Sequence, residues 1–259
     1  YQWYRDGVVV AGQTNSTLSL SAVSVAQAGG YTVVIGSAGG SVTSAAALLT
    51  VTTLPVPTSG RLINLSINTS ISSGGNFTMG YVVGGPAGTR SLLVRAVGPG
   101  LAAFGVPGTL SDPKFELYTG SALTGGNDNW GGGASLANAF ASVGAFSLDP
   151  ASLDAATQVS VANPSTGNTT VIVSGNKTSA GLVLAEIYDL ATTYNAASGR
   201  LVNVSVNKNI AAGETLIAGF VIDGGTGCKV LVRAVGPGLA AFGVPGTMVD
   251  PKLVLYSGS

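Results

Sequence analysis

An internal duplication constrains the fold of this chain more than any other feature of its sequence. The segment at residues 93–109, LVRAVGPGLAAFGVPGT, recurs without change at residues 231–247. Residues 60–66 recur with conservative changes at residues 199–205. Similarity of this extent at a nearly constant spacing is the signature of tandem structural modules. The chain therefore contains two copies of one module.

The two copies differ in extent. The second copy ends opposite Ser121 of the first, so the chain holds no counterpart of residues 122–198. We expect one complete module at residues 60–194 and the first half of a second copy at residues 199–259. Two explanations stay open: the chain is a piece of a longer polypeptide, or a neighbouring chain completes the second copy.

Alternation of apolar and polar residues predicts that the module is built from β-strands. Ile63, Leu65 and Ile67 lie on one side of such a strand, and the polar residues between them lie on the other. Glycine accounts for 39 of the 259 residues, and its pairs with proline or with itself separate the strands as tight turns require. Residues 134–143 are expected to form a short helix. Further strands are expected at residues 77–83, 92–97, 115–118, 157–161, 169–174 and 182–188.

This succession of short strands predicts an all-β fold. Seven or more strands joined by regular turns are typical of antiparallel β-sandwiches, including jelly rolls. We therefore expect tandem antiparallel, jelly-roll-like β-sandwich modules, the last of them incomplete.

Composition excludes several classes of protein. Hydrophobic residues make up 46% of the chain, whereas charged residues make up only 8%. The 11 basic and 11 acidic residues balance, and a nucleic-acid binder would carry a basic excess because it neutralises phosphates. No apolar run reaches the roughly 18 residues of a membrane span. So few charges provide little repulsion between molecules, and we expect copies of the chain or adjoining domains as its partners.

The residue types needed for most catalytic and metal sites are missing. The chain has no histidine, and Cys228 is its single cysteine. Ser-His-Asp and Cys-His catalysis and histidine-ligated metals are therefore excluded, and we expect no catalytic residue, no cofactor and no bound metal. The turn at Asn127-Asp128-Asn129 offers oxygens to calcium, but a turn closed by its own side chains is the favoured interpretation. Trp130 is either a platform for sugar stacking or, as we favour, a core anchor.

Two charged residues interrupt apolar strands. Arg95 lies within residues 92–97, and Glu186 lies within residues 182–187. Because an unpaired buried charge is very costly, we expect these two residues to form a buried ion pair. The alternative is that each faces solvent. Arg233 is the equivalent of Arg95 in the second copy, and the chain contains no equivalent of Glu186 to pair with it.

Residues 1–53 are not similar in sequence to the repeated module. Trp3 lies in a strand that ends in a turn, and Tyr31 leads into two further strands. This segment resembles the later part of a bacterial immunoglobulin-like domain whose first two strands are absent. The resemblance makes Trp3 the core tryptophan and Tyr31 the tyrosine-corner residue, whose hydroxyl bonds back to the backbone. Val33 stands at the second cysteine position, so no disulfide is expected, and residues 54–59 are expected to form a short, stiff linker.

Residues 60–194 resemble a repeat module of large secreted bacterial proteins and, distantly, the pre-peptidase C-terminal β-sandwich. The resemblance is carried by LVRAVGP at residues 93–99, DNWG at 128–131, VGAF at 143–146 and EIYD at 186–189. It implies an extracellular or cell-surface location. The expected function is that of a non-enzymatic structural protein, a self-associating fibre or stalk of repeated modules. The alternative is an adhesion or carbohydrate-binding module on such a stalk, with a glycan as its partner.

Overall fold

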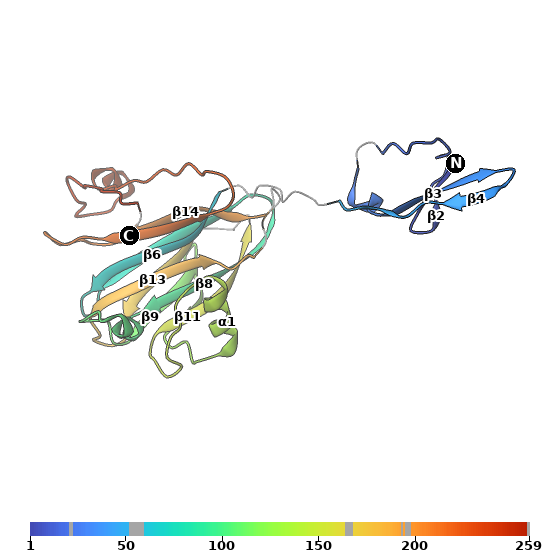
Figure 1. The fold of residues 1–259 in the computed structure, drawn as a ribbon. Coiled ribbons are helices and arrows are strands. Elements are labelled where there is room, and N and C mark those ends of the chain that lie inside the picture. Colours follow the sequence, from blue (N-terminus) through green and yellow to red (C-terminus); the bar gives the residue numbers. More distant parts are fainter. Residues whose placement is uncertain (21–22, 52–59, 164–167, 193, 195–197, 258–259) are drawn as a thin grey trace. The chain divides into compact units, whose positions relative to one another are not determined.

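The computed structural model describes residues 1–20, 23–51, 60–163, 168–192, 194 and 198–257. The chain divides into two compact units, Tyr1–Val56 and Pro57–Ser259. Both are built from antiparallel β-sheets, which confirms the expected all-β fold (Figure 1). The expected linker at residues 54–59 lies outside the described residues. Among the described residues, no helix has the length and hydropathy needed to cross a membrane.

The first unit is a single antiparallel sheet. Its strands run in the order β2-β1-β3-β4, and β5 pairs with β3. Asp6 and Gly7 turn β1 back into β2 with φ angles of 49° and 80°, the left-handed conformation that a two-residue hairpin requires. The elements are β1 (Gln2–Arg5), β2 (Val8–Val9), the 3-10 helix η1 (Val25–Gln27), β3 (Gly29–Ser37), β4 (Gly40–Thr43) and β5 (Ala47–Leu49).

The second unit contains the remaining strands and helices. Each strand expected in the first copy is present, and the expected helix spans Ala134–Ser142. The strands are β6 (Arg61–Ile71), β7 (Asn76–Gly84), β8 (Gly88–Val97), β9 (Pro113–Thr119), β10 (Ala122–Asn127), β11 (Ala155–Asn163), β12 (Thr169–Gly175), β13 (Gly181–Asp189), β14 (Arg200–Asn207) and β15 (Ile217–Asp223). The helices are η2 (Pro99–Phe104), α1 (Ala134–Ser142) and η3 (Pro237–Phe242).

The strands of the second unit form a sandwich of two layers (Figure 1). One layer has the order β10-β9-β12-β7-β14, and the other has the order β15-β6-β13-β8-β11. The two layers are linked by a single pair, Leu201 opposite Leu62. The main core lies between them, and its most deeply buried large side chains are Ile67, Phe77, Met79, Leu92, Phe115 and Ile187.

A second core covers the other face of β8. Leu93 and Val97 pack there with Trp130, with Phe140 of α1 and with Leu148. β8 is therefore buried on both faces. This explains why residues 92–97 are apolar except for Arg95, instead of alternating between apolar and polar residues.

Strands of the second copy complete the sheets of the first. β14 pairs with β7 from Arg200 to Asn207, and β15 pairs with β6 from Ile217 to Asp223. Residues 199–257 therefore belong to the same compact unit as residues 60–194. The repeated segment at residues 231–235 forms no strand, although η3 repeats the helical turn of η2.

The end of β8 depends on a glycine. A Cβ on Gly98 would overlap the carbonyl oxygen of Leu110, which is backbone and cannot rotate away. We expect Gly98→Ala to lower the free energy of unfolding by about 1–3 kcal/mol, the usual cost of overpacking. Gly227→Ala is the control, because nothing lies within 4 Å of its Cβ position. Urea denaturation would measure both, and equal stability of the two variants would contradict the prediction.

Candidate functional site

The expected ion pair is present and buried. Arg95 of β8 and Glu186 of β13 are directly opposite in the strand register. They lie on the face of β8 that the second core covers, beneath α1. The Arg95 Nε and Glu186 Oε2 atoms are 3.2 Å apart. Arg95 is fully buried and Glu186 is 4% exposed, so the alternative of two solvent-facing charges is wrong.

Several groups hold the pair in place. Arg95 Nη1 donates a hydrogen bond of 2.8 Å to the carbonyl oxygen of Phe146. Its guanidinium carbon lies 4.7 Å and 4.5 Å from the ring centres of Phe140 and Phe146, within cation–π range. The Tyr188 hydroxyl donates a hydrogen bond of 2.6 Å to Glu186 Oε1. The two ends of the pair are thus positioned by α1, by the segment after it and by β13 itself.

Burial opposes both charges. Removal from water lowers the pKa of Arg95 and raises the pKa of Glu186, and their mutual attraction offsets this only in part. Burial, followed by the neighbouring Glu186 carboxylate, also raises the pKa of Tyr188. The pair is therefore a weak source of net stability, although removing one partner strands the other charge.

A second buried ion pair lies near the other end of the same strands. Arg90 Nε is 2.9 Å from Asp189 Oδ1, and both side chains are almost fully buried. The Tyr194 hydroxyl donates to Asp189 Oδ2. The Tyr194 ring packs against the guanidinium groups of Arg61 and Arg90, whose carbons lie 3.2 Å and 4.1 Å from its centre. Burial raises the pKa of Tyr194.

Sequence reasoning missed this second cluster. Arg90 precedes the apolar run of β8, and Asp189 is the last residue of β13. Charges at strand ends usually face solvent, so neither residue attracts notice. One signal does exist, because EIYD at residues 186–189 supplies a carboxylate on each side of Tyr188.

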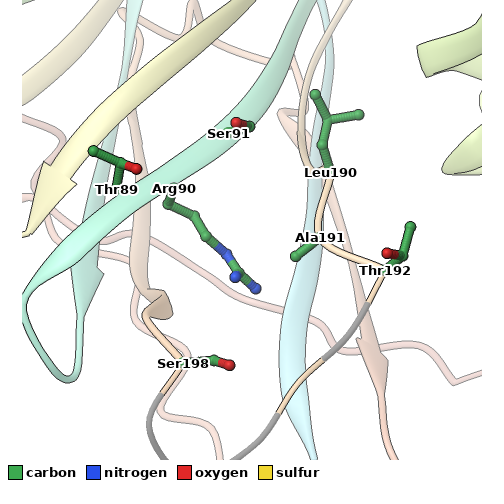
Figure 2. A pocket seen from close by; sticks show the side chains of 7 residues that line it. All are labelled: Thr89, Arg90, Ser91, Leu190, Ala191, Thr192 and Ser198. Carbon is green, nitrogen blue, oxygen red and sulfur yellow. The ribbon is translucent and has the colours of Figure 1, made fainter.

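A shallow pocket of about 370 Å³ lies beside Arg90 (Figure 2). Figure 2 shows the Arg90 side chain reaching into the space between β8 and the segment that follows β13. The pocket is lined by Thr89, Arg90, Ser91, Leu190, Ala191, Thr192 and Ser198. Asp189 balances the charge of Arg90, and none of the lining side chains is a general base. The described lining of the pocket therefore consists of hydroxyl groups and small apolar side chains around the charge-balanced Arg90.

Trp130 is a core anchor, as favoured from the sequence. Its side chain is buried, and its ring centre lies 5.3 Å from that of Phe140. Trp130 Nε1 donates to the carbonyl oxygen of Asp149 over 3.0 Å. The indole faces are therefore not available for stacking on a sugar.

The neighbouring turn is closed by its own side chains. Asn127 Nδ2 donates to the carbonyl oxygen of Asn129 over 2.9 Å, and Asn127 Oδ1 accepts from the Ala156 amide over 2.9 Å. Within the described ranges, no three Asp, Glu or Cys side chains gather in a way that could hold a metal ion.

Asp154 is a further buried carboxylate that the sequence does not reveal. Its Oδ1 accepts a hydrogen bond of 2.8 Å from the Gly98 amide, and its Oδ2 accepts one of 3.0 Å from the Gly100 amide. These bonds fix the start of η2. Asp154 therefore has a structural partner in the repeated segment itself.

The two aromatic residues named in the first unit have defined contacts. The Tyr31 hydroxyl donates a hydrogen bond of 2.7 Å to the carbonyl oxygen of Gln27, and Tyr31 is buried. This is the bond that the tyrosine-corner resemblance implies. Trp3 is half-buried and lies opposite Val33, and its Nε1 donates to the carbonyl oxygen of Asn15 over 2.9 Å.

Arg233 differs from Arg95 despite its identical surroundings in sequence. It is exposed and lies outside any strand. No ion pair joins it to another residue in the part of the chain that the structure describes.

Comparison with protein-family models, with curated proteins and with solved structures finds no match to this chain.

Removing one partner of the central pair should be strongly destabilising. We expect Glu186→Ala to lower the free energy of unfolding by about 3–5 kcal/mol, because Arg95 is left as a buried, unpaired charge. The double variant Arg95→Met with Glu186→Leu should recover most of this loss. Glu116→Ala is a matched control, since Glu116 also accepts a hydrogen bond from a tyrosine two residues on but is partly exposed. Urea denaturation would measure the free energy of unfolding of each variant. If Glu186→Ala lowers it no more than Glu116→Ala does, the prediction is contradicted.

Glu186 should also make stability depend on pH. Because burial raises its pKa, the folded protein holds this proton more tightly than the unfolded chain does. The resulting stabilisation is fully present below the ordinary glutamate pKa of about 4.3 and is lost as the pH rises through the folded value. We expect Glu186→Gln to remove this contribution. Urea denaturation of the parent and of the variant, from about pH 4 upward, would measure this pH dependence. A difference in their free energies of unfolding that does not change with pH would contradict the prediction.

Proposed function

We propose that this chain is an extracellular structural protein whose repeated β-sandwich modules join into a self-associating fibre or a cell-surface stalk. The observation that carries the proposal is the pairing of β14 with β7 and of β15 with β6. Backbone hydrogen bonds run from one copy of the repeat into the next. Strand addition of this kind is a general way of joining polypeptide segments.

When a module is repeated along a chain, junctions of this kind follow one another in one direction. Modules that contact mainly their sequence neighbours build quasi-linear arrays. Here the contact between the copies consists of strands, which are stiffer than a flexible tether. Linear growth with spaced, stiff modules is what a stalk or fibre requires.

Exposed apolar side chains support association between molecules. In the second copy these include Leu231, Phe242, Val249 and Tyr256, each more than 80% exposed. In the first unit Val8 is 70% exposed and Leu48 is 80% exposed. These side chains provide apolar area that association with another molecule can bury.

The disposition of the charged groups fits a structural role better than a catalytic one. Arg95 with Glu186, and Arg90 with Asp189, are paired in the sheets and not displayed in a cleft. The alternative of a carbohydrate-binding module has less support, because its proposed platform, Trp130, lies in the core.

Association of the full chain tests the proposal. Sedimentation velocity and electron microscopy should reveal linear particles that grow with concentration. Leu231→Glu combined with Leu255→Glu should reduce this growth, because both leucines are exposed in the second copy. Leu123→Glu with Leu153→Glu, two exposed leucines of the first copy, is the matched control. A compact monomer at every concentration would contradict the proposal.

A further inference from the structure

The edge that β11 gives to its layer of the sandwich differs from the other edges (Figure 1). β10, β14 and β15 are the remaining edge strands of the two layers, and the pairing of each shifts in register at one point. β11 pairs with β8 over nine residues without a shift. Proteins prevent edge strands from pairing by means of bulges, charged residues or proline. The sequence of β11, AATQVSVAN, has no charged residue and no proline, so this edge is suited to pairing.

A hydrogen bond shows which backbone groups of β11 point outward. The Ala156 amide donates to Asn127 Oδ1 over 2.9 Å, so it points away from β8. The N–H and C=O groups of one strand residue point to the same side, and those of the next residue point to the opposite side. The backbone groups of Gln158, Ser160 and Ala162 therefore also point away from β8.

This outward edge is open from Gln158 to Ala162. No strand among the described residues pairs with it. The Gln158 carbonyl oxygen accepts a long hydrogen bond of 3.5 Å from the hydroxyl of the adjacent Thr157. The open part of the edge is thus centred on Ser160. A row of unpaired backbone groups of this kind is a template for an added strand.

We infer that residues 158–162 form an interface between two copies of the chain, whose β11 strands pair antiparallel about Ser160. The layers that contain β11 then form one continuous sheet across the two subunits. This inference rests on the proposed self-association and names a surface through which it occurs.

The symmetry of the open edge favours a second copy as its occupant. Antiparallel pairing about Ser160 places Gln158 opposite Ala162 of the partner subunit, and Ser160 opposite Ser160 of the partner subunit. All three outward-pointing residues then find backbone partners, as a two-fold symmetric interface requires. On the side of the main core, Val159 lies opposite Val161 of the partner subunit. Cross-strand pairs of β-branched residues stabilise such a ladder.

Charge also favours this occupant. β11 is neutral along its length, and Ser91, which lies opposite Ser160 on the neighbouring strand β8, is neutral as well. Like charges directly opposite each other destabilise a strand pair, and none arise when β11 pairs with itself. A partner strand that carries a charge would find no opposite charge on β11. The chemistry of this edge therefore fits β11 of a second copy better than a charged strand of another protein.

The test places charges at the centre of the interface in the full chain. Ser160 is exposed, so a charged side chain there is compatible with the fold. Ser160→Lys and Ser160→Glu each bring like charges together in a dimer and should weaken dimerisation about 5-fold or more. An equal mixture of the two variants should recover the parent affinity, because lysine then lies opposite glutamate.

Ser91→Lys is the matched control. Ser91 is also exposed, but it lies one strand away from the interface, so its variant should dimerise as the parent does. Sedimentation equilibrium would measure the affinities. Amide exchange at Gln158 and Ala162 should slow as the concentration of the parent chain rises, which identifies the edge that is covered.

Three results would overturn the inference: a parent chain that stays monomeric at high concentration, association that both Ser160 variants retain, or a mixture that does not recover. Failure of the proposed function is distinguishable. Dimers that Ser160→Lys dissociates, and that never grow into linear particles, keep this inference and contradict the fibre. Linear particles that Ser160→Lys leaves intact keep the fibre and contradict this inference.

Discussion

A β-strand exists only where its backbone finds partners, and this requirement decides the structure of most of the second unit. The repeated segment demonstrates it within one molecule. Residues 93–97 form part of β8 between β11 and β13, whereas the identical residues 231–235 form no strand and pair with none of the strands that the structure describes. Sequence pattern makes a strand possible, but hydrogen bonds to another strand make it stable. The helical turns η2 and η3 form in both copies because their hydrogen bonds are local.

The same distinction separates what the sequence could predict from what it could not. Period-two patterns locate β6 and β7, and apolar runs interrupted by one charge each locate β8 and β13, since these signals lie within each strand. The Arg95–Glu186 pair was predictable because a charge inside an apolar run needs a partner. The pairing of β14 with β7 could not be predicted, because nothing in the local sequence identifies a partner strand more than a hundred residues away along the chain. Arg90, Asp189 and Tyr194 were missed because their burial depends on segments that cover the strand ends.

Buried charges give the sheet a register more than they give it stability. Arg95 lies opposite Glu186 on the face covered by α1, while Val94 and Ile187 lie opposite each other on the face of the main core. A shift of one residue in the register of β8 and β13 would turn a charged side chain toward the main core, where it has no partner. An apolar pair could replace the ions at little cost, but it would not penalise the shifted pairing. The ion pair therefore distinguishes the correct alignment of β8 and β13 from its neighbours.

This use of charge bears on how strands select their neighbours in a sheet. Backbone hydrogen bonds are nearly indifferent to sequence, so an exposed strand can pair with many others. Apolar burial adds affinity, at about 25 cal/mol per Å² of surface removed from water, but little discrimination. An arginine at the centre of the strand changes this, because a partner without a carboxylate leaves it buried and unpaired. In β8, apolar residues such as Leu93 supply attraction and Arg95, opposite Glu186, supplies selectivity. A strand built in this way pairs through its backbone and still rejects neighbouring strands that lack the matching charge.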